Sequence, residues 1–92
     1  MSQNIRTIAI IGTGLIGSGM ATLFLANGYD VRMLATGDAG CRKGLASIQD
    51  NYADLVHEGV LPADRPERFL KRLSFTQDYQ ELADADFVIE AV

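Results

Sequence analysis

A glycine-rich turn between an apolar strand and a helical pattern constrains this chain more than any other feature. Residues 8–21 read I-A-I-I-G-T-G-L-I-G-S-G-M-A, so a run of strand length ends in the spacing G-x-G-x-x-G and a helix follows at once. Gly12 lets the chain turn off the strand, Gly14 lets the backbone approach a pyrophosphate, and Gly17 lets the helix pack close to the sheet. The helix N-terminus then presents unpaired N–H groups to the phosphates. The stretch predicts a dinucleotide-binding turn.

The rest of the chain alternates apolar strands with helices. The patterns predict strands over residues 5–11, 30–35, 73–76 and 86–92, helices over 15–27, 39–57 and 65–71, and a helical turn over 79–83. Asp64 and Glu67 have the spacing of a capping box for the third helix. The expected buried stripe of the first helix is Gly17, Met20, Ala21 and Phe24.

This alternation predicts an α/β fold. Right-handed crossovers give a Rossmann-like, doubly wound parallel sheet with strand order 3-2-1-4 and a pair of helices inserted after the second strand. The first strand is apolar on both faces, which is typical of a central parallel strand. Because a full doubly wound domain adds strands beside the fourth, we expect residues 1–92 to be the N-terminal part of a dinucleotide-binding domain.

Composition narrows the possible partners and compartment. The net charge is −4 and no basic run is present, which argues against nucleic-acid binding. No apolar segment has membrane-spanning length, and no spacing of metal ligands is found. Cys41 is the single cysteine and cannot form an internal disulfide. We expect a cytoplasmic protein, or an organellar one if a transit peptide has been removed.

Several segments together resemble the N-terminal NAD-binding domain of the 3-hydroxyacyl-CoA dehydrogenases. They are the fingerprint over residues 12–21, G-Y-D-V over 28–31, H-E-G-V-L over 57–61 between the two inserted helices, and A-D-F-V-I-E-A-V over 85–92. The last segment is similar to the family's A-D-x-V-I-E-A-V. The likeness covers essentially the whole chain.

This resemblance implies a cofactor site and an activity. Gly12, Gly14 and Gly17, with the backbone at Leu15 and Ile16, would hold the pyrophosphate of NAD. Ala91 and Val92 would lie near the ribose or the nicotinamide. In the family, a histidine paired with a glutamate takes the proton from the 3-hydroxyl of a hydroxyacyl-CoA as hydride moves to the cofactor. Those residues, and a helical domain, follow the E-A-V segment, so this chain alone is expected to be inactive. The resemblance also implies that the parent protein is a homodimer.

The end of the second strand departs from the family. The position that normally carries the acid for the adenosine ribose hydroxyls is Ala35, followed by Thr36. Alanine cannot bind the diol, and its neutrality removes the repulsion that excludes a 2′-phosphate. Thr36, with Arg42 or Lys43, would then favour NADP; alternatively, Asp38 contacts the ribose. The family predicts NAD, whereas Ala35 permits NADP.

Three single residues have modest expected roles. His57 is expected at the surface near a helix C-terminus, Cys41 is expected to be an ordinary thiol, and Glu90 is expected to shape the cofactor cleft. No catalytic residue is therefore predicted within the chain. Two rival functions remain: a family member acting on another small hydroxy acid, and a non-catalytic nucleotide-binding or interaction module.

Overall fold

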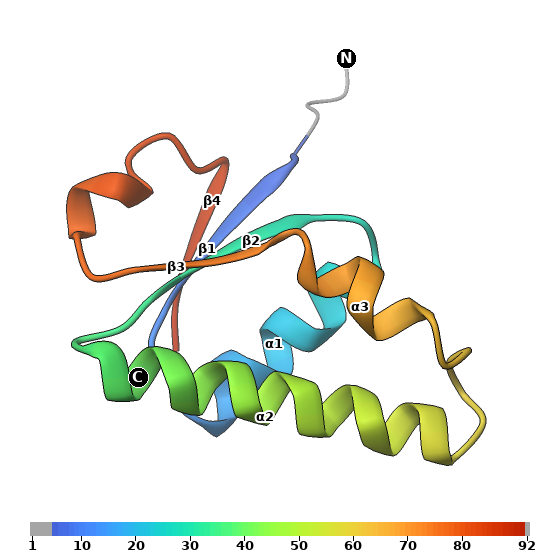
Figure 1. The fold of residues 1–92 in the computed structure, drawn as a ribbon. Helices are drawn as coiled ribbons and strands as arrows, with labels where there is room; N and C mark the ends of the chain where they lie inside the picture. Colours follow the sequence, from blue (N-terminus) through green and yellow to red (C-terminus); the bar gives the residue numbers. More distant parts are fainter. Residues whose placement is uncertain (1–4, 92) are drawn as a thin grey trace.

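The computed structural model describes residues 5–91 and shows the predicted alternation of strands and helices (Figure 1). The elements are β1 (Thr7–Ile11), α1 (Leu15–Ala26), β2 (Asp30–Leu34), α2 (Asp38–His57), α3 (Arg65–Leu70), β3 (Leu73–Thr76), the 3-10 turn η1 (Tyr79–Leu82) and β4 (Phe87–Glu90). Their ends differ from the predicted ones by a residue or two. The predicted fourth strand also included Val92, which lies outside the described residues.

The strands form one parallel sheet in the order β3-β2-β1-β4, which confirms the predicted Rossmann-like topology. Ile10 of β1 pairs with Met33 of β2 and with Ile89 of β4. Because all strands run the same way, their carboxyl ends meet at one edge of the sheet, where the turns after β1 and β2 lie next to each other.

The helices α1, α2 and α3 cover one face of the sheet and enclose the core (Figure 1). Ile10 and Met33 from the sheet pack there with Leu25, Ile48 and Tyr52 from the helices, and all five are fully buried. The Tyr52 hydroxyl donates to the carbonyl of Thr22 at 2.8 Å. Burial raises the pKa of Tyr52 to about 12.

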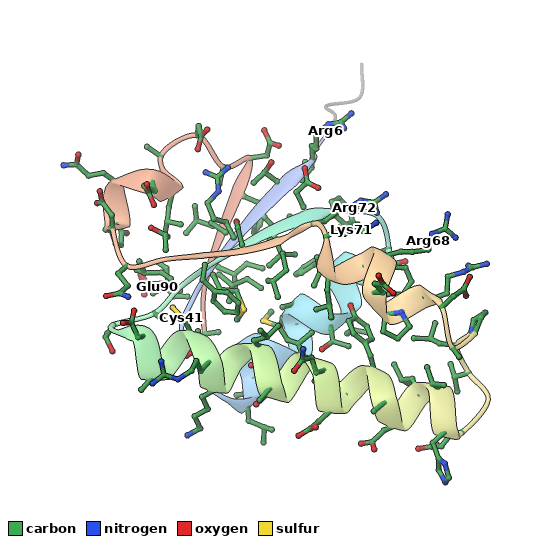
Figure 2. The ribbon with its side chains drawn as sticks, viewed as in Figure 1. Arg6, Cys41, Arg68, Lys71, Arg72 and Glu90 are labelled. Carbon is green, nitrogen blue, oxygen red and sulfur yellow. The ribbon has the colours of Figure 1, made fainter. Side chains whose placement is uncertain are left out.

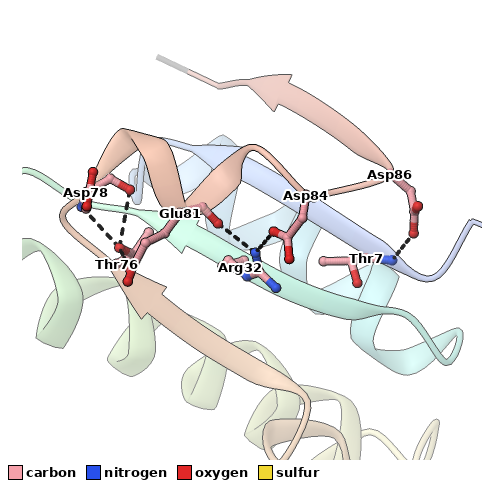
Figure 3. Close-up of polar contacts among 7 residues, drawn as sticks. All are labelled: Thr7, Arg32, Thr76, Asp78, Glu81, Asp84 and Asp86. Carbon is pink, nitrogen blue, oxygen red and sulfur yellow. Dashed lines mark hydrogen bonds and ion pairs between the residues drawn. The ribbon is translucent and has the colours of Figure 1, made fainter.

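The opposite face is covered by the short connection that contains η1, and its contacts are polar. Arg32 lies on this face and donates to the carbonyl of Glu81 at 2.6 Å and to the carboxylate of Asp84 at 2.5 Å (Figure 3). Thr76 donates to the carboxylate of Glu81. The hydrogen bond and the charge of Arg32 lower the pKa of Asp84. A hollow of about 520 Å³ lies around Arg32, away from the turn after β1.

The strand β4 is more exposed than its apolar sequence indicates. Phe87 is 52% exposed and Val88 is 46% exposed, because within residues 5–91 β4 pairs on one side only, with β1. At its start, the carboxylate of Asp86 accepts hydrogen bonds from the backbone N–H groups of Arg6 and Thr7, both at 2.9 Å (the Thr7 bond is drawn in Figure 3). These bonds lower the pKa of Asp86 and join the amino ends of β1 and β4.

The predicted capping box of α3 is wrong. Asp64 has φ −87° and ψ −6°, a helical conformation, and its side chain makes no capping hydrogen bond. An N-cap residue needs an extended backbone to aim its side chain at the first turn. The carboxylate of Asp64 instead lies 3.6 Å from Nε of Arg65.

The buried stripe of α1 also differs from the prediction. Gly17 and Ala21 are buried as expected, but Ser18, Thr22 and Leu25 are buried as well, whereas Met20 and Phe24 are only half-buried. The two hydroxyls are buried at little cost because each has a backbone acceptor: Ser18 donates to Thr13 at 3.2 Å and Thr22 to Ser18 at 2.8 Å.

Candidate dinucleotide-binding site

Two glycines of the turn after β1 are required by the fold itself. Gly12 has φ 112°, a conformation that side chains disfavour, and its N–H donates to the carbonyl of Leu34 at 3.1 Å. A Cβ on Gly17 would overlap the carbonyl oxygen of Gly12 and lie 3.2 Å from its carbonyl carbon. Glycine at 17 therefore lets α1 begin directly against the turn.

Gly14 is different, because nothing inside the protein requires a glycine there. It has φ −74° and ψ −166°, which other residues adopt easily, and a Cβ added to it would meet no atom of residues 5–91 within 4 Å. The space in front of this residue is open. Gly14 precedes α1 as its N-cap, so this open space faces the start of the helix.

The first turn of α1 has unpaired backbone donors. The first hydrogen bond of the helix runs from Ser18 N–H to the carbonyl of Gly14 at 2.9 Å, and no acceptor within residues 5–91 receives the N–H of Leu15 or Ile16. The first turn contains no acidic residue. The positive end of the helix dipole is therefore not neutralised, and these donors can receive an anion.

The turn after β2 has the opposite character. The Ala35 side chain is only 4% exposed, and its N–H donates to the carbonyl of Thr76 at 3.0 Å. Thr36 is exposed. The carboxylate of Asp38, the alternative ribose acceptor, lies in the first turn of α2 and accepts a hydrogen bond from Gln77 at 2.7 Å. The turn therefore has a buried alanine at position 35, with the exposed Thr36 next to it.

The carboxyl end of β4 reaches the same site. The N–H of Ala91 donates to the carbonyl of Ile11 at 2.9 Å, and the Cβ of Ala91 lies 3.5 Å from where a Cβ on Gly17 would be. Ala91 therefore lies against the turn after β1. Val92, predicted beside it, falls outside the described residues.

Sequence reasoning missed the contact between α2 and this turn. A Cβ on Gly44 would lie 3.0 Å from the Cβ of Thr13 and 3.2 Å from the ring of Phe75, and one on Gly40 would lie 3.5 Å from the hydroxyl of Thr13. The first half of α2 therefore packs directly on Thr13. The available signal was the spacing of the two glycines, four residues apart on one side of a helix.

The structure places the remaining candidate residues at the ends of elements. His57 ends α2 as an exposed residue, Cys41 is half-buried near its start, and Glu90 is exposed at the end of β4. Figure 2 shows Cys41 and Glu90 at the carboxyl edge of the sheet. In residues 5–91 no three histidine, cysteine or acidic side chains are grouped to hold a metal, and no helix is long and apolar enough to cross a membrane.

Relatives of this chain share both the fold and the sequence. The peroxisomal fatty acid β-oxidation multifunctional protein AIM1 of Arabidopsis thaliana is 38% identical over 88 residues, which are 96% of this chain and 12% of that protein. The 3-hydroxyadipyl-CoA dehydrogenase of Escherichia coli K12 is 35% identical over 91 residues, 99% of this chain and 19% of that protein. The crystal structure of (S)-3-hydroxybutyryl-CoA dehydrogenase PaaH1 from Ralstonia eutropha has a TM-score of 0.91 at 31% identity, covering 97% of this chain and 31% of that chain.

The fold and the turn after β1 define a dinucleotide-binding domain of the Rossmann type. Residues 7–92 match the family described as 3-hydroxyacyl-CoA dehydrogenase, NAD binding domain, and the chain belongs to that family. The resemblance inferred from its motifs is therefore confirmed. The chain spans 19% or less of the length of AIM1 and of the 3-hydroxyadipyl-CoA dehydrogenase.

Proposed function

We propose that this chain is the cofactor-binding part of an oxidoreductase that oxidises the 3-hydroxyl of a hydroxyacyl-CoA by hydride transfer to NAD or NADP. The observation that carries the proposal is the open space in front of Gly14, next to the unpaired N–H groups of Leu15 and Ile16. A pyrophosphate needs both features, since its oxygens must approach the backbone closely and then accept hydrogen bonds from it.

Each residue of the site has a proposed role. Gly12 and Gly17 shape the turn, Gly14 admits the pyrophosphate, and the N–H groups of Leu15 and Ile16 donate to it. Ala91, with Val92 next in sequence, lies near the ribose or nicotinamide. The bound cofactor supplies the hydride acceptor, while these residues bind and orient it.

The adenosine end of the site is proposed to accept NAD without excluding NADP. Ala35 offers no carboxylate to bind the ribose diol or to repel a 2′-phosphate, and Thr36 is exposed beside it. Arg42 and Lys43 are exposed near the start of α2, and neither makes an ion pair within residues 5–91. Either side chain would support a 2′-phosphate.

The chemistry is proposed to need residues beyond this chain. The names of two of the relatives above specify 3-hydroxyadipyl-CoA and 3-hydroxybutyryl-CoA, which supports a hydroxyacyl-CoA as the substrate class. We propose that residues 1–92 are the N-terminal part of the cofactor domain of a cytoplasmic, homodimeric parent enzyme. The purified chain should then show no turnover of 3-hydroxybutyryl-CoA, and turnover would contradict this division of roles.

A titration tests the proposed function against its rivals. NADH and NADPH are added separately to the purified chain, and binding is followed by the change in nicotinamide fluorescence. The proposal expects saturable binding of NADH. A non-catalytic interaction module would bind neither dinucleotide, and that result would overturn the proposal. A family member acting on another small hydroxy acid would still bind NADH, and substrate assays on the longer parent enzyme would distinguish it.

A further inference from the structure

Half of the cations of this acidic chain lie in one short segment. Residues 65–72 contain Arg65, Arg68, Lys71 and Arg72 against the single carboxylate of Glu67. The segment therefore has a charge of +3 within a net charge of −4, which leaves −7 on the remaining residues. We refer to the four cations as the basic edge, because α3 and the start of β3 lie at the amino ends of the strands.

Three side chains of the basic edge are exposed and unpaired. Arg68, Lys71 and Arg72 form no ion pair within residues 5–91, whereas Arg65 lies 3.6 Å from the carboxylate of Asp64. Figure 2 shows the three unpaired cations close together, at the end of the sheet away from Glu90. The basic edge therefore lies far from the turn after β1, at the opposite edge of the sheet.

The backbone beneath these cations is held in place by the core. The ring centroids of Phe69 and the fully buried Tyr52 lie 5.5 Å apart. The carbonyl of Arg72 accepts from the N–H of Val31 at 3.0 Å, and the N–H of Arg72 donates to Phe69 at 3.1 Å. The cations therefore project from fixed positions rather than from a loose loop.

The surface around Arg72 is concave. One hollow of about 200 Å³ is lined by Arg65, Arg68, Phe69 and Arg72. A second, of about 290 Å³, lies on the other side of Arg72 and includes Lys71 and the amino ends of β1, β2 and β3. Glu67 lines neither hollow, whereas Asp30 lines the second. Three guanidinium groups thus line the first hollow; Arg65 is paired with Asp64, whereas Arg68 and Arg72 have no ion pair within residues 5–91.

We propose that the basic edge is a second anion site, which binds a compact phosphate-bearing small molecule such as a diphosphate. Guanidinium groups form paired hydrogen bonds with phosphate oxygens, and the unpaired Arg68 and Arg72 line one hollow, where they can share a single anion. A long polyanion or an anionic membrane fits less well, because the rest of the chain carries −7 and would repel an extended negative surface. This site is independent of the dinucleotide site and of the proposed reaction.

The test is a titration of the ¹⁵N-labelled chain with inorganic pyrophosphate at low ionic strength, followed by amide chemical shifts. The expected result is a saturable shift of the amides over residues 65–73, which weakens as salt is added. The double variant R68Q/R72Q should raise the dissociation constant for pyrophosphate at least about tenfold. The double variant A46E/A53E lowers the net charge by the same amount at two exposed positions of α2, and it should change the dissociation constant by less than about twofold.

Three results would overturn the proposal. Shifts confined to residues 12–17 would mean that pyrophosphate binds only at the turn after β1, and G14V in the same titration identifies that component. Equal losses in the two double variants would mean that net charge alone matters. Binding to phosphatidylglycerol vesicles without binding to pyrophosphate would indicate a membrane surface. R68Q/R72Q should bind NADH as the parent chain does, so a negative result for the anion site would not contradict the proposed dinucleotide site. If the double variant does not fold, K71Q is used in its place.

Discussion

The turns after β1 and β2 are adjacent at the same edge of the sheet, yet they differ in almost every physical property. The first contains a glycine with φ 112°, and α1 follows it with no acidic residue in its first turn. The second reaches α2 through Gly37 in an ordinary extended conformation with φ −175°, and Asp38 lies in the first turn. One helix start is thus open to an anion, while the other already holds a carboxylate.

This difference separates two parts of cofactor recognition. In the proposed site, backbone N–H groups bind the pyrophosphate, so this part of the site depends on where glycines allow close approach and should tolerate change in the surrounding side chains. In the proposed site, recognition of the ribose depends on the side chain at the end of β2, so a single substitution at position 35 should alter it. Affinity for a dinucleotide and preference between NAD and NADP should therefore respond to different mutations.

The largest expected effect is at Gly17. G17A places a methyl group into the carbonyl of Gly12, and the turn must shift to relieve the overlap. We expect a loss of about 3 kcal/mol in the free energy of unfolding, together with loss of NADH binding. Urea denaturation and the fluorescence titration measure the two effects.

Gly19 supplies the matched control for this substitution. It lies two residues further along α1, and a Cβ on it would meet nothing within 4 Å in the described part of the chain. G19A should increase the free energy of unfolding by about 0.5–1 kcal/mol, because alanine is the better helix former. Equal destabilisation by G17A and G19A would contradict the assigned contact between Gly17 and Gly12.

Gly14 should affect binding without affecting the fold. G14V fills the open space in front of the turn, so we expect NADH affinity to fall at least about a hundredfold. The free energy of unfolding should fall by no more than about 1 kcal/mol, the cost of losing a good N-cap residue. NADH binding by G14V at the parent affinity would show that Gly14 serves only as a linker.

A substitution at Ala35 tests the other turn. A35D should shift the ratio of the NADPH and NADH dissociation constants at least about tenfold towards NADH, because a carboxylate binds the ribose diol and repels a 2′-phosphate. A35N is the control, since it retains hydrogen bonding without the charge and should shift the ratio less. An unchanged ratio in A35D would mean that position 35 does not face the ribose.

The smallest effect concerns acid stability at the amino edge. The pKa of Asp86 is lowered in the folded state by the N–H groups of Thr7 and Arg6. Its carboxylate therefore stabilises the fold above its ordinary pKa range, and this stabilisation is lost as the pH falls through the lowered value. D86N should reduce the Tm at pH 7, with the gap narrowing below about pH 4. The control D54N, whose carboxylate has no partner within residues 5–91, should leave the Tm unchanged.

The strand order and the turn after β1 could be predicted because their signals are local. A run of apolar residues ending in G-x-G-x-x-G specifies a strand, a turn and a helix within fourteen consecutive positions. The contact of Gly17 with Gly12, five residues earlier, confirms the role predicted for Gly17. The same spacing marked Gly14 as a residue whose missing Cβ leaves the backbone open, and within residues 5–91 the structure has open space there.

The features that escaped prediction join residues distant in the sequence. The ion pair of Arg32 with Asp84 spans 52 positions, and no pattern near either residue indicates it. The packing of Thr13 against Gly40 and Gly44 could be predicted only if one knew that α2 passes over the turn after β1. The edge position of β4, by contrast, follows from the predicted strand order 3-2-1-4.

The most direct test of the central claim is an amide chemical-shift map of the ¹⁵N-labelled chain at saturating NADH. The account predicts that the largest shifts occur at Gly14, Leu15 and Ile16, where unpaired N–H groups meet the pyrophosphate, and that G14V abolishes them. It also predicts smaller shifts at Ala35 and Thr36, because the adenosine ribose is held there without a charged side chain. Saturable NADH binding that leaves the amides of residues 12–17 unmoved would contradict the account.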